Sequence, residues 1–321
     1  MMKSFFVICI LFSSLIAKSP SLDEMIGQML MVGVSGSKSS EKWVKQLKND
    51  IKNGQVGGII LSKNSVENPK QVKKLISFLT SDKTKYPLFV AKKHNDFIPY
   101  PDAHKISQNN TLLESYKIYR TIAGNLKSYG FNLSFAPNVD LSAENPRAYS
   151  PYEEIVIAYS SELLEAQKDA GIVSVINHFP GSTNNWKYEA LKPYFHFIKY
   201  EKVSAIMVGN TKVDILDKKY PASLSKKILK DLLRDKLKFD GVVFSDDMKA
   251  INKHYGLKKS VILAINAGVD ILVYSSYFTK KSSVINDVKK VIKEAVRSGD
   301  IKIEDIQNSY NRIIRLKNDI N

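Results

Sequence analysis

Two apolar, strand-like runs of the chain end in side chains that could do chemistry. The run 242–244 leads into the aspartates Asp246 and Asp247, and the run 172–176 leads into His178. β-branched and aromatic residues favour buried strands, whereas an ionised Asp is almost never fully buried without a partner. We therefore expect both strands to deliver polar side chains into one shared cleft. Two strands with polar ends therefore indicate one shared site.

The elements that would position these side chains recur along the chain. Strand-like runs, separated by longer segments with helical spacing such as 112–129, 155–170, 224–237 and 284–296, occur at 31–34, 56–61, 88–91, 133–136, 172–176, 205–208, 242–244 and 271–274. This alternation is typical of parallel strands joined by helical crossovers. Roughly eight such units in about 300 residues predict an α/β fold, a (β/α)₈ TIM-type barrel in a single domain. Functional groups of such barrels gather at the C-terminal ends of the strands, where we expect Asp246 and His178.

The first residues have the pattern of a secretory signal peptide. Residues 1–3 are short and basic, residues 5–11 are apolar, and small residues lead to Ala17. We therefore assign residues 1–17 to a signal peptide and residues 18–321 to the barrel, and expect an exported, periplasmic protein. An uncleaved N-terminal anchor is the alternative, although the apolar run is shorter than the roughly 20 residues of a transmembrane helix.

The composition narrows the classes of partner. The formal net charge is +16, but the excess is lysine scattered through the chain, with no recognisable nucleic-acid motif, so we expect no nucleic-acid partner. A basic surface would still favour an anionic cell-envelope surface through long-range attraction. The five histidines show no clustered ligand pattern, and the only cysteine, Cys9, lies in the expected signal peptide. We therefore expect no metal site, no cofactor and no thiol chemistry.

Four motifs of the chain resemble those of a known family. The segment 221–251 is similar to the corresponding region of bacterial β-N-acetylglucosaminidases of glycoside hydrolase family 3. HFPG at 178–181, FAPNVDLS at 135–142 and NAGVDILV at 266–273 occur in the matching order. The resemblance implies a family 3 N-terminal-type barrel and a retaining hydrolase with Asp246 as nucleophile. Its carboxylate would attack the anomeric carbon and form a covalent glycosyl-enzyme, which water then hydrolyses.

The resemblance also suggests roles for the neighbouring polar residues. His178 matches a histidine that helps hold the sugar, with a satisfied buried histidine as the alternative. Arg147 resembles the arginine after the fourth strand, whose forked donors would bind a hydroxyl or a carboxylate, unless it pairs with a nearby acid. Asp140 would stabilise its loop and could face the site. Asp247 would orient its loop or cap the next helix, and capping is also the alternative role for Asp246.

The chain departs from the family at the sugar-binding and acid–base motif. Where the family has K-H-F-P-G-H-G, Asn177 replaces the sugar-binding lysine and Ser182 replaces the later histidine. The family then uses a D-x-H loop whose histidine is the general acid and base, and no Asp-x-His occurs in 183–189. Glu189 is the nearest carboxylate that could replace it, although an acid there would also suit the first turn of a helix.

A second departure follows the predicted strand 88–91. The family's V-D-Q-E-G-G-R-V stretch supplies an aspartate and an arginine for the terminal sugar, whereas 92–99 reads KKHNDFIP. Lys93 then stands in place of the acid and Ile98 in place of the arginine, and Asp96 could recover a contact only if the loop has shifted. Each lost charge-assisted hydrogen bond is worth about 1.5–3 kcal/mol, so we expect weak or no activity on a standard N-acetylglucosaminide.

Two hypotheses from different classes follow. The first is an exported β-glycosidase that acts on cell-wall-derived or related glycans, with Asp246 as nucleophile. The second is a catalytically impaired barrel that serves as a periplasmic glycan-binding or protein-binding module. Asp246 and His178 favour the first, and the lost acid loop favours the second. The resemblance leads us to prefer the enzyme, without naming its acid.

Overall fold

The computed structural model covers most of the chain after the expected signal peptide. It describes residues 19–82, 84–92, 98–182, 186–276 and 283–320. The expected signal peptide, Lys93, the candidate Asp96 and residues 183–185 thus lie outside the described residues. Within the described ranges, no helix is long and apolar enough to cross a membrane.

The strands are short, and apart from β5 and one position of β6 their residues are buried. They are β1 (Leu30–Gly33), β2 (Gly58–Leu61), β3 (Phe89–Lys92), β4 (Leu133–Ser134), β5 (Val173–Ser174), β6 (Ile176–Phe179), β7 (Ala205–Val208), β8 (Val242–Ser245) and β9 (Leu272–Tyr274). Most fall on the predicted runs and are rich in apolar residues, as is typical of strands covered on both faces. β6 extends past the predicted end at residue 176, so that Asn177 and His178 lie within the strand.

All strand pairs are parallel, as the alternating pattern predicts. One sheet has the order β5-β4-β3-β2-β1-β9 and the other has the order β6-β7-β8. Two isolated parallel bridges, Asn138 with Asn177 and Phe244 with Ile271, lie at the junctions between these sheets. The structure therefore shows a TIM-like α/β arrangement with a parallel sheet and surrounding helices. Closure into one continuous eight-stranded barrel stays a prediction, because the described strands form two sheets.

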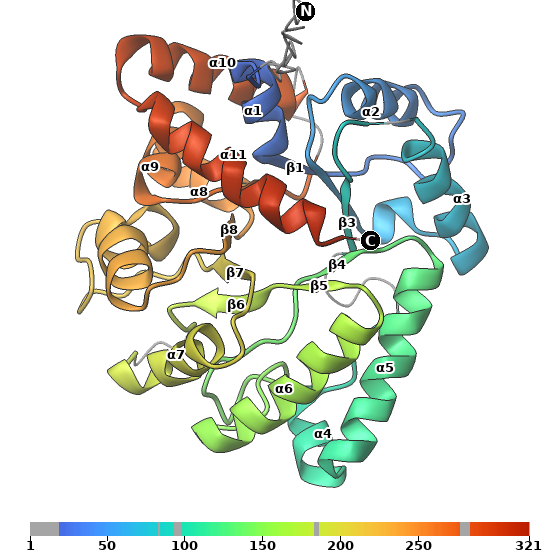
Figure 1. The fold of residues 1–321 in the computed structure, drawn as a ribbon, viewed down its shortest axis with the longest axis vertical. Helices are drawn as coiled ribbons and strands as arrows, with labels where there is room; N and C mark the ends of the chain where they lie inside the picture. Colours follow the sequence, from blue (N-terminus) through green and yellow to red (C-terminus); the bar gives the residue numbers. More distant parts are fainter. Residues whose placement is uncertain (1–18, 83, 93–97, 183–185, 277–282, 321) are drawn as a thin grey trace, which may run out of the picture.

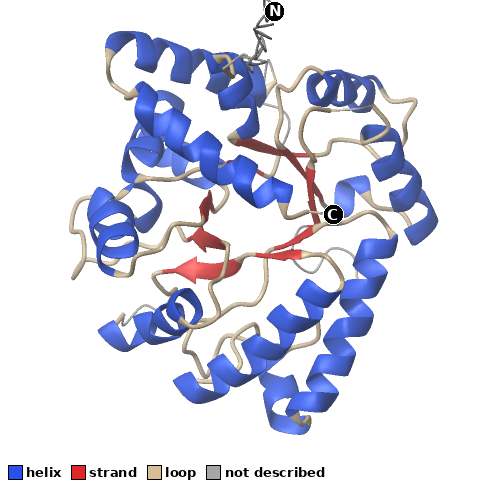
Figure 2. Ribbon diagram, in the orientation of Figure 1, coloured by secondary structure: helices blue, strands red, loops and turns tan. Residues whose placement is uncertain are grey.

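The helices surround the strands (Figures 1 and 2). They are α1 (Leu22–Gln28), α2 (Lys42–Lys52), α3 (Pro69–Leu79), α4 (Ala103–Asn109), α5 (Leu112–Ser128), α6 (Glu153–Asp169), α7 (Lys192–Lys199), α8 (Met248–Tyr255), α9 (Leu257–Ala267), α10 (Val284–Ser298) and α11 (Ile303–Asn318), with the 3₁₀ turns η1 (Lys63–Ser65), η2 (Tyr188–Leu191) and η3 (Ala222–Leu224) and the π-helix η4 (Lys227–Lys236). Three predicted helices, 112–129, 155–170 and 284–296, are confirmed as α5, α6 and α10. The fourth, 224–237, divides into η3 and η4.

Aromatic side chains from both sheets share one core. The ring of Phe244, from β8, contacts the ring of Phe89, from β3, at a centroid distance of 5.9 Å. It also contacts Phe135, just beyond β4, at 5.7 Å. Edge-to-face contacts of this kind add to the stabilisation from burial. They pack β3, β8 and the segment just beyond β4 around a common centre.

Candidate active site

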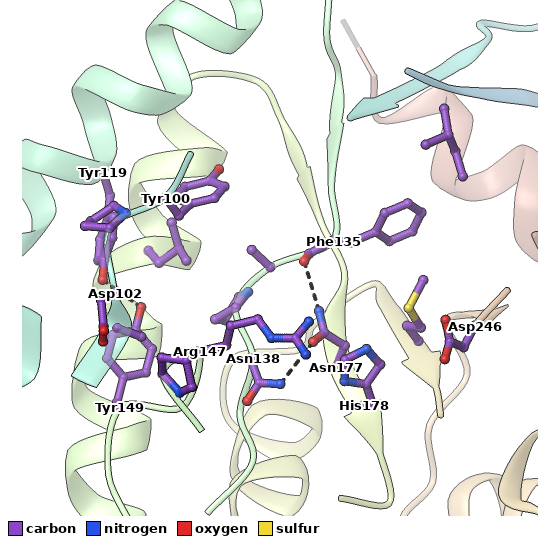
Figure 3. A pocket seen from close by; sticks show the side chains of 18 of the residues that line it. Tyr100, Asp102, Tyr119, Phe135, Asn138, Arg147, Tyr149, Asn177, His178 and Asp246 are labelled. Atoms are coloured by element: carbon purple, nitrogen blue, oxygen red, sulfur yellow. Dashed lines mark hydrogen bonds between the residues drawn. The ribbon is translucent and has the colours of Figure 1, made fainter. Parts of the chain in front are cut away.

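The C-terminal ends of the strands border a cavity of about 440 Å³ (Figure 3). Its charged and amide side chains are Asp102, Asn138, Arg147, Asn177, His178, Asp246 and Asp247. The cavity therefore brings together Asp246, Asp247, His178 and Arg147, which were chosen from the sequence. Neither Asp140 nor Glu189 belongs to the lining. The volume lies within the range of small-molecule sites, about 300–1,000 Å³.

Asp246 takes its position from the end of β8. The strand residues before it are buried, whereas Asp246 itself is partly exposed. Its backbone N–H donates to the carbonyl of Val208 on β7 at 2.9 Å, so the sheet register continues as far as this residue. Among the described residues, its carboxylate accepts one hydrogen bond, from the Asp247 N–H at 2.6 Å. No other described residue occupies its remaining lone pairs, which can therefore meet a ligand in the cavity.

Asp247 is tied to the protein on several sides. Its carboxylate accepts from the backbone N–H of Lys249 at 3.1 Å and thereby caps α8. It also accepts from the N–H of Ser275 at 3.3 Å and from the Ser275 hydroxyl. The Asp247 carbonyl accepts from the Asn210 amide at 3.3 Å. Asp247 therefore orders the loops after β7, β8 and β9 around Asp246, and Asp246 makes no comparable helix cap.

His178 and Asn177 come from the end of β6 and differ in how the protein holds them. The Asn177 amide is buried and donates to the carbonyls of Phe135 at 3.0 Å and Val175 at 3.3 Å. The His178 imidazole is partly exposed, lines the cavity and, within the described residues, has no hydrogen-bond partner. The imidazole is thus available to a ligand, whereas the Asn177 amide is already committed to the scaffold.

Arg147 reaches the cavity from the loop between β4 and α6. Its backbone N–H donates to the Asn145 side chain at 3.0 Å, which fixes the turn. Figure 3 shows its guanidinium group extended toward Asn177 and His178. The side chain is exposed and forms no ion pair with any described residue. An unpaired guanidinium that always carries its charge can bind a hydroxyl or a carboxylate.

The comparison with protein families identifies the family of this α/β chain. The family described as "Glycosyl hydrolase family 3 N terminal domain" matches residues 21–316 of the 321. The chain belongs to glycosyl hydrolase family 3. The family resemblance carried by residues 221–251 and by the HFPG motif is thereby confirmed.

Named relatives of this family 3 chain are β-hexosaminidases. Beta-hexosaminidase LpqI of Mycobacterium tuberculosis is 27% identical over 247 residues, which is 68% of this chain and 62% of the relative. The beta-hexosaminidase of Photobacterium profundum is 29% identical over 254 residues, 70% of this chain and 75% of the relative. The match with the mycobacterial relative therefore spans less than two thirds of that protein's length.

Solved structures agree on the fold. A family 3 β-N-acetylglucosaminidase from Paenibacillus sp. str. FPU-7 superposes with a TM-score of 0.80 at 26% identity, covering 93% of this chain and 62% of the other. A family 3 glycosyl hydrolase from Mycobacterium smegmatis gives 0.81 at 23% identity, covering 93% and 98%. The second likeness, at lower identity, concerns the fold alone.

In this family 3 chain, Asp140 lies beneath the cavity wall, 1% exposed. Its carboxylate accepts from the Asn138 amide at 3.1 Å and from the Ser182 hydroxyl, and its N–H donates to Asn138 at 3.1 Å. No cation among the described residues pairs with it, and one of its oxygens is buried without a hydrogen-bond partner there. Burial, and secondarily the Asp140 charge, raises the pKa of the nearby Tyr194 well above its usual value. Asp140 therefore supports the loop instead of facing the cavity.

The other acid candidate of the family 3 pattern lies apart from the site. Glu189 is exposed in η2, in the first turn of the helical segment that leads into α7. That is the position typical of an acid that stabilises a helix start. Asp96 lies outside the described residues. The described lining of the cavity therefore contains no carboxylate from residues 183–189 or 92–99.

The sequence reasoning did not identify one wall of the cavity. Tyr100, Tyr119 and Tyr149 form it together with Asp102 (Figure 3). The Tyr119 and Tyr149 hydroxyls are 2.8 Å apart, and the Gln167 amide donates to the Tyr100 hydroxyl at 2.8 Å. Burial raises the pKa of all three phenols, so they stay neutral. Asp102 caps α4 by accepting a hydrogen bond from the Lys105 N–H at 3.1 Å. In the sequence, the Pro-Asp pair at this position indicates a helix start but not a place in the cavity.

Proposed function

We propose that this chain is an exported glycoside hydrolase that cleaves β-linked, N-acetylglucosamine-containing or related glycans of the cell wall through a covalent intermediate on Asp246. The main support is one observation: the Asp246 carboxylate stands at the end of β8 in the cavity, and among the described residues it accepts one hydrogen bond, from the Asp247 N–H. The family and the names of its relatives support hydrolysis of hexosaminides as the reaction class.

The proposed chemistry needs a carboxylate that is ionised and uncovered. The hydrogen bond from the Asp247 N–H orients the carboxylate, and the other oxygen, which has no hydrogen-bond partner among the described residues, would attack the anomeric carbon. The ordering of Asp247 by Ser275 and α8 would keep this geometry in place during the reaction. Asp246 is thus the nucleophile, and Asp247 is a positioning residue.

Two further cavity residues would hold the sugar. The Arg147 guanidinium, with no ion-pair partner in the described ranges, can donate to ring hydroxyls or to an acidic substituent. The His178 imidazole can bind a hydroxyl as donor or acceptor. The formal charge of +16 would draw the protein toward anionic envelope polymers, consistent with export to the periplasm.

Because position 177 carries Asn and not the lysine of the family motif, we expect a lower affinity for the sugar. The Asn177 amide is occupied by two backbone carbonyls, so it has little to offer a sugar. A charge-assisted hydrogen bond contributes about 1.5–3 kcal/mol, which corresponds to roughly tenfold to a hundredfold in affinity. We therefore expect slow turnover of an ordinary N-acetylglucosaminide.

Trapping the glycosyl-enzyme tests this proposal. The protein is mixed with a panel of 2,4-dinitrophenyl β-glycosides, including the N-acetylglucosaminide, whose leaving group needs little acid assistance. A burst of dinitrophenolate equal to the enzyme concentration, with one sugar mass on the peptide that contains Asp246, is the expected result. Asp246→Asn should give neither signal. Absence of an adduct with every sugar would reject the hydrolase.

The second candidate function is a glycan-binding or protein-binding barrel without turnover. The neutral network of Asn177, Asn138 and Ser182 around the buried Asp140 favours it, because Asn177 and Ser182 stand where the family motif has a lysine and a histidine. Under this proposal the wild-type protein and Asp246→Asn bind N-acetylglucosamine oligomers equally in calorimetry. No adduct forms in either protein.

A further inference from the structure

The proposed hydrolysis needs a group in the cavity that can donate and accept a proton. Most of the charged residues that line the cavity are unsuited to this role. Asp102 caps α4 and lies beside Tyr149, at the end of the cavity away from Asp246 (Figure 3), and Asp247 is occupied by Ser275 and by the cap of α8. Arg147 stays protonated at any physiological pH. Among the described charged residues of the cavity lining His178 remains, and its imidazole can both donate and accept a proton.

The sheet register brings His178 and Asp246 to opposite sides of one gap. β6 and β8 both pair with β7, with Asn177 opposite Met207 and Val208 opposite Ser245. Neighbouring strands are about 4.8 Å apart, so the backbones at His178 and Asp246 are separated by about 10 Å. Figure 3 shows both side chains at the same end of the cavity, away from Tyr100 and Tyr119.

Gly209 keeps that gap open. It follows Val208 at the end of β7, between the strand ends that carry His178 and Asp246. A Cβ built on Gly209 would lie 3.2 Å from the His178 Cβ, closer than ordinary van der Waals contact. The absence of a side chain at this position leaves space beside the imidazole, where the bond to be cleaved could lie between His178 and Asp246.

From this arrangement we propose that His178 is the general acid and base of the chain, a role beyond holding the sugar. The inference rests on the proposed function. In the first step the Asp246 carboxylate forms a bond to the anomeric carbon while the bond to the leaving oxygen breaks, and imidazolium His178 gives that oxygen its proton. In the second step neutral His178 takes a proton from water, the water oxygen bonds to the anomeric carbon, and Asp246 leaves as a carboxylate.

A proton donor and a sugar-holding residue respond differently to the leaving group. Protonation matters for a poor leaving group such as phenol and matters little for 2,4-dinitrophenol. A general acid contributes about 10²- to 10⁴-fold. A residue that only holds the sugar affects both substrates by the same factor, because the sugar is the same in both.

The experiment compares His178→Gln with wild type on phenyl and 2,4-dinitrophenyl glycosides of the sugar that labels Asp246. His254→Gln is the matched control, since His254 is exposed on α8 and does not line the cavity. We expect His178→Gln to lose about 10²- to 10⁴-fold in kcat/KM on the phenyl glycoside and less than about tenfold in forming the dinitrophenyl adduct. Added azide should restore turnover of the dinitrophenyl substrate and yield a glycosyl azide.

A positioning variant guards against misfolding of the histidine mutant. Gly209→Ala keeps the imidazole but displaces it, so we expect a smaller loss with the same dependence on the leaving group. Equal losses on both substrates in His178→Gln, or no glycosyl azide, would overturn the inference while an adduct on Asp246 still upholds the hydrolase. No adduct in the wild-type protein would overturn both.

Discussion

Asn177 and Asp140 are linked through a single side chain: the Asn138 amide lies 3.1 Å from an Asp140 oxygen and 3.4 Å from the Asn177 oxygen. Ser182 donates to the same Asp140 carboxylate. The two replacements in the K-H-F-P-G-H-G motif are therefore parts of one network. Both replace a cationic or titratable side chain with a neutral one, around a carboxylate that is almost fully buried.

This network predicts that Asn177→Lys will gain ligand affinity. A lysine here would place an ammonium group beside Asp140 and the cavity, where it can bind a sugar hydroxyl with a charge-assisted hydrogen bond. We expect N-acetylglucosamine to bind about tenfold or more tightly, measured by calorimetry. Asn266→Lys, on α9, adds the same charge outside the cavity lining and is the control. An equal effect of both variants would show that overall charge, and not the contact, is responsible.

The two adjacent aspartates should separate activity from stability. Asp247 caps α8 and holds Ser275, so Asp247→Ala should lower the free energy of unfolding by about 0.5–2 kcal/mol. Asp246→Asn retains an acceptor for the Asp247 N–H and should unfold like the wild type, yet form no glycosyl-enzyme. Urea denaturation and intact mass spectrometry measure these effects. A large loss of stability in Asp246→Asn would indicate a structural role for that carboxylate.

The positions of the strand ends could be predicted because the chemistry is local. The run 242–244 is apolar and β-branched or aromatic, and the aspartates after it cannot continue a buried strand. The same reasoning placed the end of the run 172–176 too early, because β6 continues to Phe179. At the edge of a sheet, a polar side chain such as His178 can belong to the strand and still face a cavity.

The tyrosine wall could not be predicted because it depends on contacts between distant segments. Tyr119 on α5 and Tyr149 in the loop before α6 meet through their hydroxyls, and either residue alone has the pattern of an ordinary core aromatic. Arg147 posed the opposite problem. The sequence left open whether Arg147 pairs with an acid. The folded loop shows that it forms no ion pair with any described residue.

A buried ion cluster lies at the N-terminal ends of the strands, opposite the cavity, and we expect it to make a large contribution to the free energy of unfolding. Asp270, just before β9 and fully buried, pairs with Arg234 at 2.7 Å and Arg312 at 3.1 Å. It also accepts from Ser309 and from the backbone N–H of Val243. Asp270 thus joins η4 and α11 to the sheet. Burial lowers the pKa of Arg234, although the Asp270 charge opposes that shift.

We predict that Asp270→Ala will lose about 3–5 kcal/mol of unfolding free energy, because it leaves two partly buried guanidinium groups unpaired. The exposed pair of Arg315 and Asp240 is the matched control, and Asp240→Ala should cost at most about 1 kcal/mol. Urea denaturation of both variants measures the difference. Similar small losses in both would mean that water compensates the buried arginines.

The buried Lys317 allows a prediction of how the free energy of unfolding depends on pH. Lys317 on α11 is 1% exposed, and its ammonium group donates to the Gln28 side chain at 2.8 Å and to the Gly57 carbonyl at 2.7 Å. It also lies 4.7 Å from the centroid of the Phe89 ring. All three partners are neutral. Burial therefore lowers the pKa of Lys317 from 10.5 to about 7.

The direction of the pH effect follows from proton binding in the two states. Between the folded pKa of about 7 and the unfolded pKa near 10.4, the unfolded chain binds a proton that the folded chain has released. Stability therefore rises with pH across this window, by up to about 1.4 kcal/mol per pH unit from this group. Below pH 7 both states bind the proton, and the full cost of burying the charge applies.

Lys317→Met should remove this dependence. We expect the variant to be more stable than wild type, with the largest difference at or below about pH 7 and a diminishing difference toward pH 10. Urea denaturation at intervals of one pH unit measures it, and Lys258→Met, at an exposed position on α9, supplies the surface control. Parallel pH curves for Lys317→Met and wild type would mean that the three neutral contacts hold the ammonium group at its ordinary pKa, so that burial of the charge carries no net penalty.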